Sequence, residues 1–173
     1  TSEKYYFKSN ESLPKPKIVR KREKGIIYSV SSWGGYFYIH TNKGAEDFKI
    51  ERSRDIEASK WEVFIPAKNE TMIGGLTFLK NWIIRSELNN ALDKNFVRDI
   101  NSNKEEELIF TDEEVYDGSI SHTQKDRNTD LIYISYSTPK TQARTYLYNL
   151  KTKEKKLVKE QVIPTGHDPK NYI

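Results

Sequence analysis

The chain has 173 residues, 35% of them hydrophobic and 12% aromatic, and 29 Lys or Arg side chains against 25 Asp or Glu give a net charge of +4. This aromatic content argues against disorder, and so small a charge excess argues against nucleic-acid binding through a concentrated basic face. The sequence has no cysteine, which excludes disulfide scaffolds, thiol catalysis and cysteine-based zinc sites.

The apolar runs are short; Trp82-Ile83-Ile84 is one of the longest and is far too short to cross a bilayer. The first residues, 1–6, lack an initiator Met and any pattern of a secretory signal. We therefore expect a cytoplasmic protein with neither a membrane nor a nucleic acid as partner, and a start that lies inside a longer polypeptide.

A four-strand pattern recurs along the chain. Strand-like segments begin at Ile26, Met72 and Tyr116, at intervals of 46 and 44 residues, and three more short apolar runs follow each. A repeat of four strands over this length is typical of β-propeller blades. The sequence predicts an all-β chain, a propeller fragment of about three and a half antiparallel blades.

Turn residues set the predicted boundaries. Trp33-Gly34-Gly35-Tyr36 has the composition of a tight hairpin, and Pro66 ends a fourth strand because proline cannot donate to the sheet. We expect two outer strands of a preceding blade in residues 1–24, blades at 25–68, 69–112 and 113–161, and a linker at 162–173.

Alternation within two strands predicts which side chains share a face. In residues 47–51, Phe48 and Ile50 alternate with charges; in residues 61–65, Trp61, Val63 and Ile65 alternate with Phe64 on the opposite face. Residues 131–136 are apolar on both faces, which predicts cover from both sides. Such a fragment leaves apolar blade faces uncovered, so we expect it to self-associate or to borrow the missing blades from the intact chain.

The sequence predicts no catalytic, metal or cofactor site. His40, His122 and His167 lack metal-ligand spacing, and His40 is interpreted as a packed or surface residue. Ser119, Asp130 and His167 occur in hydrolase order, but no G-x-S-x-G motif is present to expose a nucleophile. The acidic runs 105–107 and 112–114 are expected to form a solvated rim that flanks an outer strand.

The order of several motifs resembles the propeller of prolyl-oligopeptidase-type serine peptidases. The motifs are residues 28–38 with the Trp33 hairpin, residues 61–66, Ser135-Tyr136-Ser137-Thr138-Pro139, and residues 146–150. The final stretch, 162–172, is most similar to the oligopeptidase B (protease II) branch of that family, just before its hydrolase domain.

This resemblance implies a seven-bladed propeller that covers an α/β-hydrolase domain and admits short basic peptides, which are cleaved after Arg or Lys. No triad position has a counterpart here, so this chain alone is expected to be inactive. Its partners would be the hydrolase domain and the remaining blades of the same polypeptide. First strands line the channel of such propellers, which makes four residues candidates for channel-facing positions: Ser29, Ser31, Thr77 and Ser119. The hinge towards the hydrolase domain would contain Pro164, Gly166 and Pro169.

One alternative stays open at this point. The chain could be a stand-alone propeller-type module that binds a protein or a peptide. A G-x-S-x-G motif encoded within the couple of hundred codons after Ile173 would favour the peptidase, and an early stop codon would favour the module.

Overall fold

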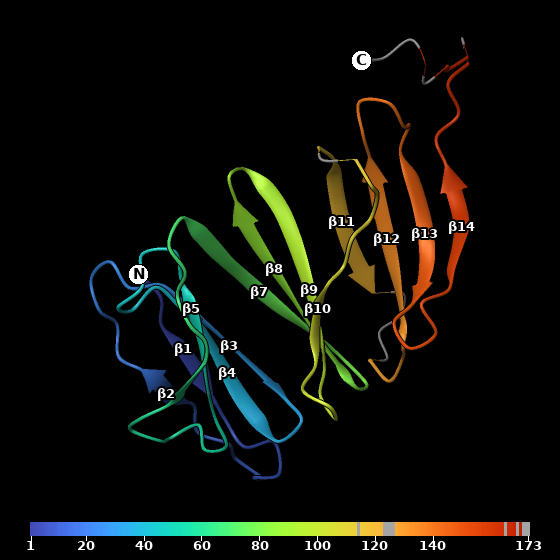
Figure 1. Ribbon diagram of the computed structural model, residues 1–173. Helices are drawn as coiled ribbons and strands as arrows, with labels where there is room; N and C mark the ends of the chain where they lie inside the picture. The colour runs from blue at the N-terminus through green and yellow to red at the C-terminus, as the bar shows by residue number, and fades with distance from the viewer. Residues whose placement is uncertain (114, 123–126, 165, 169, 171–173) are drawn as a thin grey trace. The chain divides into compact units, whose positions relative to one another are not determined.

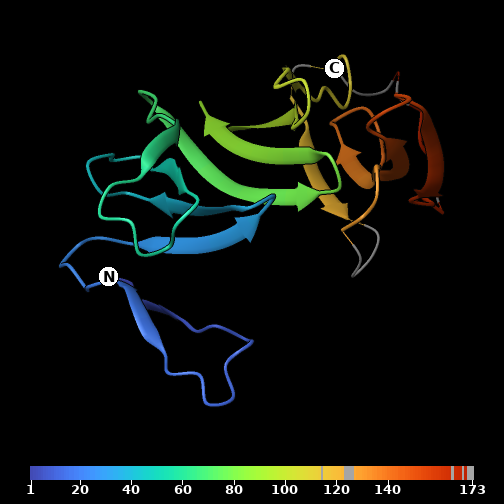
Figure 2. The ribbon, with the colours of Figure 1, turned by 90° about the horizontal axis from the view of Figure 1, so that it is seen from below.

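A computed structural model describes residues 1–113, 115–122, 127–164, 166–168 and 170 (Figures 1 and 2). Within these residues, fourteen strands form three four-stranded antiparallel sheets and one two-stranded sheet, without an α-helix. This confirms the predicted all-β class. None of the described segments is a helix long and apolar enough to cross a lipid bilayer.

The chain divides into two compact units, residues 1–75 and residues 76–173. Unit 1 contains the two-stranded sheet and the first four-stranded sheet. The two-stranded sheet consists of β1 (Lys4–Tyr6) and β2 (Lys17–Arg20), and the four-stranded sheet has the order β3 (Tyr28–Trp33), β4 (Tyr36–Thr41), β5 (Lys49–Ser53) and β6 (Glu62–Ile65).

The predicted hairpin between β3 and β4 is confirmed. Trp33 pairs with Tyr36, and the two residues between them, Gly34 and Gly35, have φ values of 58° and 77°. Two consecutive left-handed residues make the turn whose twist matches that of the strands, and glycine adopts them without a clash from a Cβ atom.

Two predicted details of unit 1 are wrong. Phe48 precedes β5 instead of lying in it, with a φ of 68°, and its ring stacks on His40 at a centroid distance of 4.5 Å. In β6, Ile65 pairs with Ile50 while Val63 pairs with the next residue of β5, so Phe64 is an extra residue. Such a bulge breaks the alternation of the strand, and Val63 is consequently 55% exposed.

The core of unit 1 packs the two-stranded sheet against the four-stranded one. Tyr28, Ile39 and Trp61 are buried, and Val19 of β2 packs against them. The hydroxyl of Tyr28 accepts a hydrogen bond from the Lys4 amide and donates one to the Arg20 carbonyl, both at 2.9 Å. The side chain of one tyrosine therefore connects β3 to both strands of the small sheet.

Two sheets make up most of unit 2, although β7 begins in unit 1. The first has the order β7 (Thr71–Leu79), β8 (Trp82–Asn89), β9 (Leu92–Asp99) and β10 (Glu105–Glu107), and the second the order β11 (Asp117–His122), β12 (Leu131–Ser137), β13 (Arg144–Asn149) and β14 (Lys155–Glu160). One prediction is corrected here: the glutamates 105–107 do not flank the outer strand but form it, as β10.

The core of unit 2 lies where these two sheets meet, shown in green to yellow and in orange to red in Figure 1. It is formed by side chains from both sheets and from the segment that joins them: Leu79, Ile84, Val97, Leu108, Phe110, Ile132, Ile134, Tyr136 and Leu150. Along β12, Ile132 and Ile134 are buried, whereas Leu131 and Tyr133 on the opposite face are only half-buried. Both faces of β12 were expected to be covered; the face with Ile132 and Ile134 is buried, and the opposite face is covered in part.

Candidate functional site

The four predicted channel-facing residues all lie on strands that stand at the end of their sheets. Ser29 and Ser31 belong to β3, Thr77 to β7 and Ser119 to β11. The three serines are exposed, and Thr77 is half-buried. Small hydroxyl side chains at such positions can donate hydrogen bonds to a peptide or accept them from it. Their place in a channel stays a prediction.

In unit 1 the structure brings two of these residues together beside β1. Ser29 and Ser31 line a groove of about 350 Å³. Its remaining lining is mainly aromatic and aliphatic: Lys4, Tyr5, Tyr6, Val19, Val30, Ser32, Phe37 and Ile56. This combination of an apolar wall with a few hydroxyl groups suits the side chains of a short peptide.

The contacts of His40 agree with its interpretation as a packed residue. His40 is packed, with its Nε2 atom 2.7 Å from the carbonyl oxygen of Ile73. His122 ends β11 and is exposed, and His167 Nε2 lies 2.8 Å from the carbonyl oxygen of Lys140. Among the residues that the structure describes, no group of three or more His, Cys, Asp or Glu side chains could hold a metal ion.

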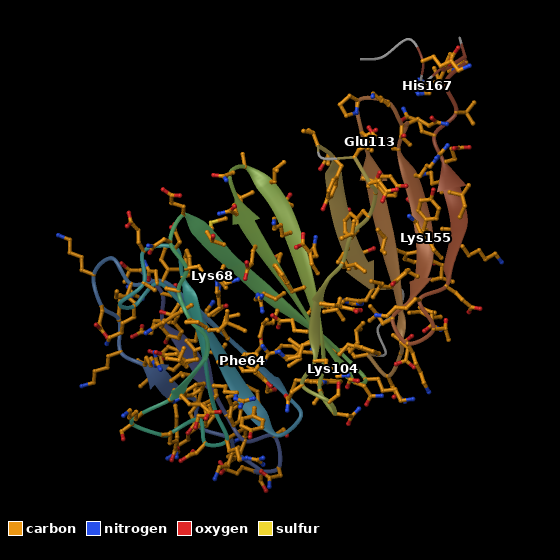
Figure 3. All side chains as sticks on the ribbon, in the orientation of Figure 1. Phe64, Lys68, Lys104, Glu113, Lys155 and His167 are labelled. Carbon is orange, nitrogen blue, oxygen red and sulfur yellow. The ribbon has the colours of Figure 1, made fainter. Side chains whose placement is uncertain are left out.

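Asp130, one of the three residues in hydrolase order, forms a hydrogen bond that links two parts of the fold. It accepts a hydrogen bond from Trp82 Nε1 at 2.8 Å. Trp82 in turn lines a groove of about 450 Å³ in unit 2, together with Val97, Asp99, Ser102, Lys104, Glu105, Glu106 and Lys153 (Lys104 is labelled in Figure 3). The Lys153 ammonium lies 5.9 Å from the centre of the Trp82 ring and pairs with Glu106.

This groove, which we call the Trp82 groove, combines one aromatic ring with several charged side chains. The amide of Asn101 donates to the carboxylate of Asp99 at 2.8 Å, and this bond, against the opposing effect of partial burial, lowers the pKa of Asp99. The Asp99 carboxylate therefore stays charged to a lower pH than an ordinary aspartate does. The groove could not be predicted from the sequence, because Trp82 begins β8 whereas Lys153 lies far along the chain, in the turn between β13 and β14.

A buried ion-pair network crosses the first sheet of unit 2. Arg85 and Glu87 are each 4% exposed, and the two join at 2.8 Å between Nε and Oε1. Glu105 Oε2 accepts from Arg85 and from Arg98, both at 2.9 Å. Glu105 is exposed, as expected for a solvated rim, and its carboxylate also connects β8, β9 and β10. A charge as buried as that of Arg85 requires such partners, so this cluster is structural.

The C-terminal segment contacts the end of the last sheet. Gly166 has a φ of 84° and donates its amide to the Ile163 carbonyl at 2.9 Å, across Pro164. The nearby turn is held by Glu113, which accepts from the hydroxyl groups of Thr138 and Thr141 at 2.8 and 3.3 Å (Glu113 and His167 are labelled in Figure 3). Pro169, the third predicted hinge residue, lies outside the described residues. The hinge role of this segment stays a prediction.

Comparison with known proteins identifies the family. The sequence of residues 1–161 matches the family described as the prolyl oligopeptidase N-terminal β-propeller domain. The chain belongs to this family. This confirms the family resemblance that the motif order indicated and the propeller fold that the four-strand repeat predicted. The four-stranded sheets described above are the blades of such a propeller domain.

Two curated relatives show how much of a whole protein this propeller chain represents. It is 27% identical over 159 residues to dipeptidyl aminopeptidase BI of Pseudoxanthomonas mexicana, and 29% identical over 168 residues to Protease 2 of Moraxella lacunata. These alignments cover 90% and 96% of this chain but only 21% and 23% of the relatives. The chain therefore spans less than a quarter of their length.

Solved structures with the same fold include two forms of oligopeptidase B. The enzyme from Trypanosoma brucei, in a closed form with covalently bound antipain, matches with a TM-score of 0.80 at 24% identity, over 92% of this chain and 24% of that chain. The enzyme from Leishmania major matches with a TM-score of 0.79 at 17% identity, over 98% and 25%. At this level of identity, the likeness shows the fold.

Proposed function

We propose that this chain is the non-catalytic propeller part of a serine oligopeptidase of the oligopeptidase B type, which cleaves peptides after Arg or Lys. In this role it would cover the hydrolase domain of the same polypeptide and admit short basic peptides to it. The match of residues 1–161 to the propeller family of such peptidases carries the proposal. The proposed location is the cytoplasm.

Two structural features support an access role over a catalytic one. The exposed serines on β3 and β11 offer hydroxyl groups that can form hydrogen bonds with a peptide. The C-terminal segment that holds Pro164 and Gly166 contacts the turn between β12 and β13 through His167, whose Nε2 atom lies 2.8 Å from the Lys140 carbonyl oxygen. As a hinge, this segment would allow two domains to part for substrate entry.

The first experiment tests whether catalysis lies elsewhere. The purified 173-residue chain, incubated with a fluorogenic substrate that ends in Arg, should show no turnover. Turnover that a serine-directed inhibitor abolishes would overturn the proposal. The gene sequence beyond Ile173 distinguishes this proposal from the alternative, because a stop codon soon after Ile173 would make the chain a stand-alone interaction module.

The second experiment tests access in the full-length protein. Ser31→Trp and Ser119→Trp should reduce turnover of a ten-residue peptide that contains Arg more than turnover of a dipeptide substrate, because a bulky ring narrows a channel without touching the catalytic groups. Ser9→Trp, at an exposed position outside the first strands, is the matched control. Equal effects of Ser31→Trp on both substrates would count against a channel position.

A further inference from the structure

Three strand ends of unit 1 bring a set of cationic and aromatic side chains to one end of the sheet. Tyr36 begins β4, Arg52 and Ser53 end β5, and Glu62 begins β6. These strands are antiparallel neighbours, and Arg52 pairs with Glu62. Together they line a groove of about 300 Å³, which we call the Tyr36 groove: Tyr36, Arg52, Ser53, Arg54, Lys60 and Glu62.

Aromatic rings hold the two guanidinium groups of this groove in place. The guanidinium carbon of Arg52 lies 4.7 Å from the ring centres of both Tyr36 and Phe64, and that of Arg54 lies 4.4 Å from the Tyr36 ring centre (Phe64 is labelled in Figure 3). The Phe64 ring packs edge-on against the buried Tyr38 at 5.4 Å. A stacked guanidinium keeps the N–H groups at its edge available, and it loses less freedom when it binds an acceptor.

The Tyr36 groove has more positive charge than its own acid can neutralise. Arg52, Arg54 and Lys60 contribute +3 and Glu62 contributes −1, which leaves +2. Glu62 pairs with Arg52. Within the described part of the chain, neither Arg54 nor Lys60 forms an ion pair with a carboxylate, although both line the groove. Arg54 and Lys60 thus line a concave surface without an ion-pair partner among the described residues.

We propose that the Tyr36 groove binds a phosphate dianion, free or carried by a peptide side chain. The charge of a phosphate group, about −1.5 to −2 at neutral pH, matches the net +2 of the groove, whereas a carboxylate has only one charge. Phosphate oxygens suit the forked donors of stacked arginines, and Lys60 adds a point charge. This inference does not depend on the proposed peptidase function.

The test is calorimetric titration of the 173-residue chain, at constant ionic strength, with inorganic phosphate, with a phosphoserine pentapeptide and with its unphosphorylated counterpart. We expect saturable binding of the first two ligands only. Arg54→Gln should weaken it by about tenfold, the usual effect of removing a charge-assisted donor. Glu62→Gln should strengthen it, because Arg52 is then released from its internal partner.

Lys156→Gln is the matched control, because it removes one positive charge from an exposed position in unit 2. Equal weakening by Arg54→Gln and Lys156→Gln would overturn the proposal in favour of attraction by net charge alone. Acetate that binds as tightly as phosphate would overturn the assignment to a dianion. Lys60→Gln provides a second, independent variant, and circular dichroism verifies that each variant is folded. Tighter binding of the phosphopeptide or of inorganic phosphate supports the site and identifies the source of the group.

Discussion

The ammonium group of Lys155 on β14 donates a hydrogen bond of 3.0 Å to the main-chain carbonyl of Phe110, in the segment that joins the two sheets of unit 2 (Lys155 is labelled in Figure 3). The same ammonium lies 4.2 Å and 4.9 Å from the ring centres of Tyr146 and Tyr136. Burial, together with a hydrogen bond to Tyr146, raises the pKa of Tyr136 to about 12. The Lys155 ammonium group therefore connects β14, the outermost strand of the last sheet, to the segment that leads into β11, the first strand of that sheet.

Lys155→Met should lower the free energy of unfolding by about 1–3 kcal/mol, because it keeps most of the apolar part of the side chain but removes the ammonium group that donates to the Phe110 carbonyl. Urea denaturation measures the change. Lys156→Met, at the exposed next position, should change stability by less than about 0.5 kcal/mol. Equal effects of the two substitutions would show that the Lys155 contact contributes nothing.

Gly118→Ala should destabilise unit 2 by about 1–3 kcal/mol through overpacking. A Cβ atom at Gly118 would lie 2.5 Å from Cδ2 of the buried Phe110 ring, which the surrounding core holds in place. Gly75→Ala is the control, because a Cβ atom there meets nothing within 4 Å. A melting temperature of Gly118→Ala no lower than that of the control would contradict this packing.

Trp61→Ala should cost about 3–5 kcal/mol, the usual range for removing a buried aromatic side chain. Trp61 is 7% exposed, packs in the core of unit 1, and donates from Nε1 to the Ala58 carbonyl at 3.1 Å. Chemical denaturation of the purified variant provides the measurement. A loss below about 1 kcal/mol would place this side chain at the surface.

Acid should weaken unit 1 partly through Glu51. Burial alone would raise the pKa of this carboxyl, but hydrogen bonds from Arg20 and Lys49, at 2.8 and 3.0 Å, outweigh burial and lower it below the ordinary 4.5. A lowered pKa means that the carboxylate stabilises the fold above pH 4.5, and that this contribution is lost as the pH falls through the folded value. Glu51→Gln should therefore flatten the acid limb of a stability-versus-pH curve; an unchanged slope would contradict this.

The half-buried face of β12 and β13 should make the isolated chain self-associate. Leu131, Tyr133 and Leu147 lie on the face opposite the core of unit 2. In sedimentation velocity experiments, we expect a sedimentation coefficient that rises with concentration. Tyr133→Lys should abolish this rise because it places a charge on the face, whereas Leu13→Lys, at a residue 88% exposed in unit 1, should not. A monomer at every concentration would contradict the prediction.

The sequence predicted the features that depend on neighbouring residues. The two glycines after Trp33 require a tight turn, and the hairpin is present. Alternation in residues 61–65 predicted burial of Trp61 and Ile65 but failed at Val63, because one extra residue in a strand reverses its faces without any compositional sign. Of the candidate site, the family resemblance predicted channel-facing hydroxyl groups on first strands, and their place in a channel stays a prediction. It did not predict the Tyr36 groove, whose arginines resemble ordinary strand-end charges until Phe64 packs beside them.

Short-range alternation, turn residues and motif order can be read along the chain, and they were enough to predict the class of the fold, the four-strand repeat and the family. Which charges are neutralised could be learned from the folded structure alone. Glu105 pairs with two arginines and connects three strands, whereas neither Arg54 nor Lys60 forms an ion pair with a carboxylate of the described residues. An ion pair depends on distances across strands, which are set by strand register and bulges and are not encoded by composition.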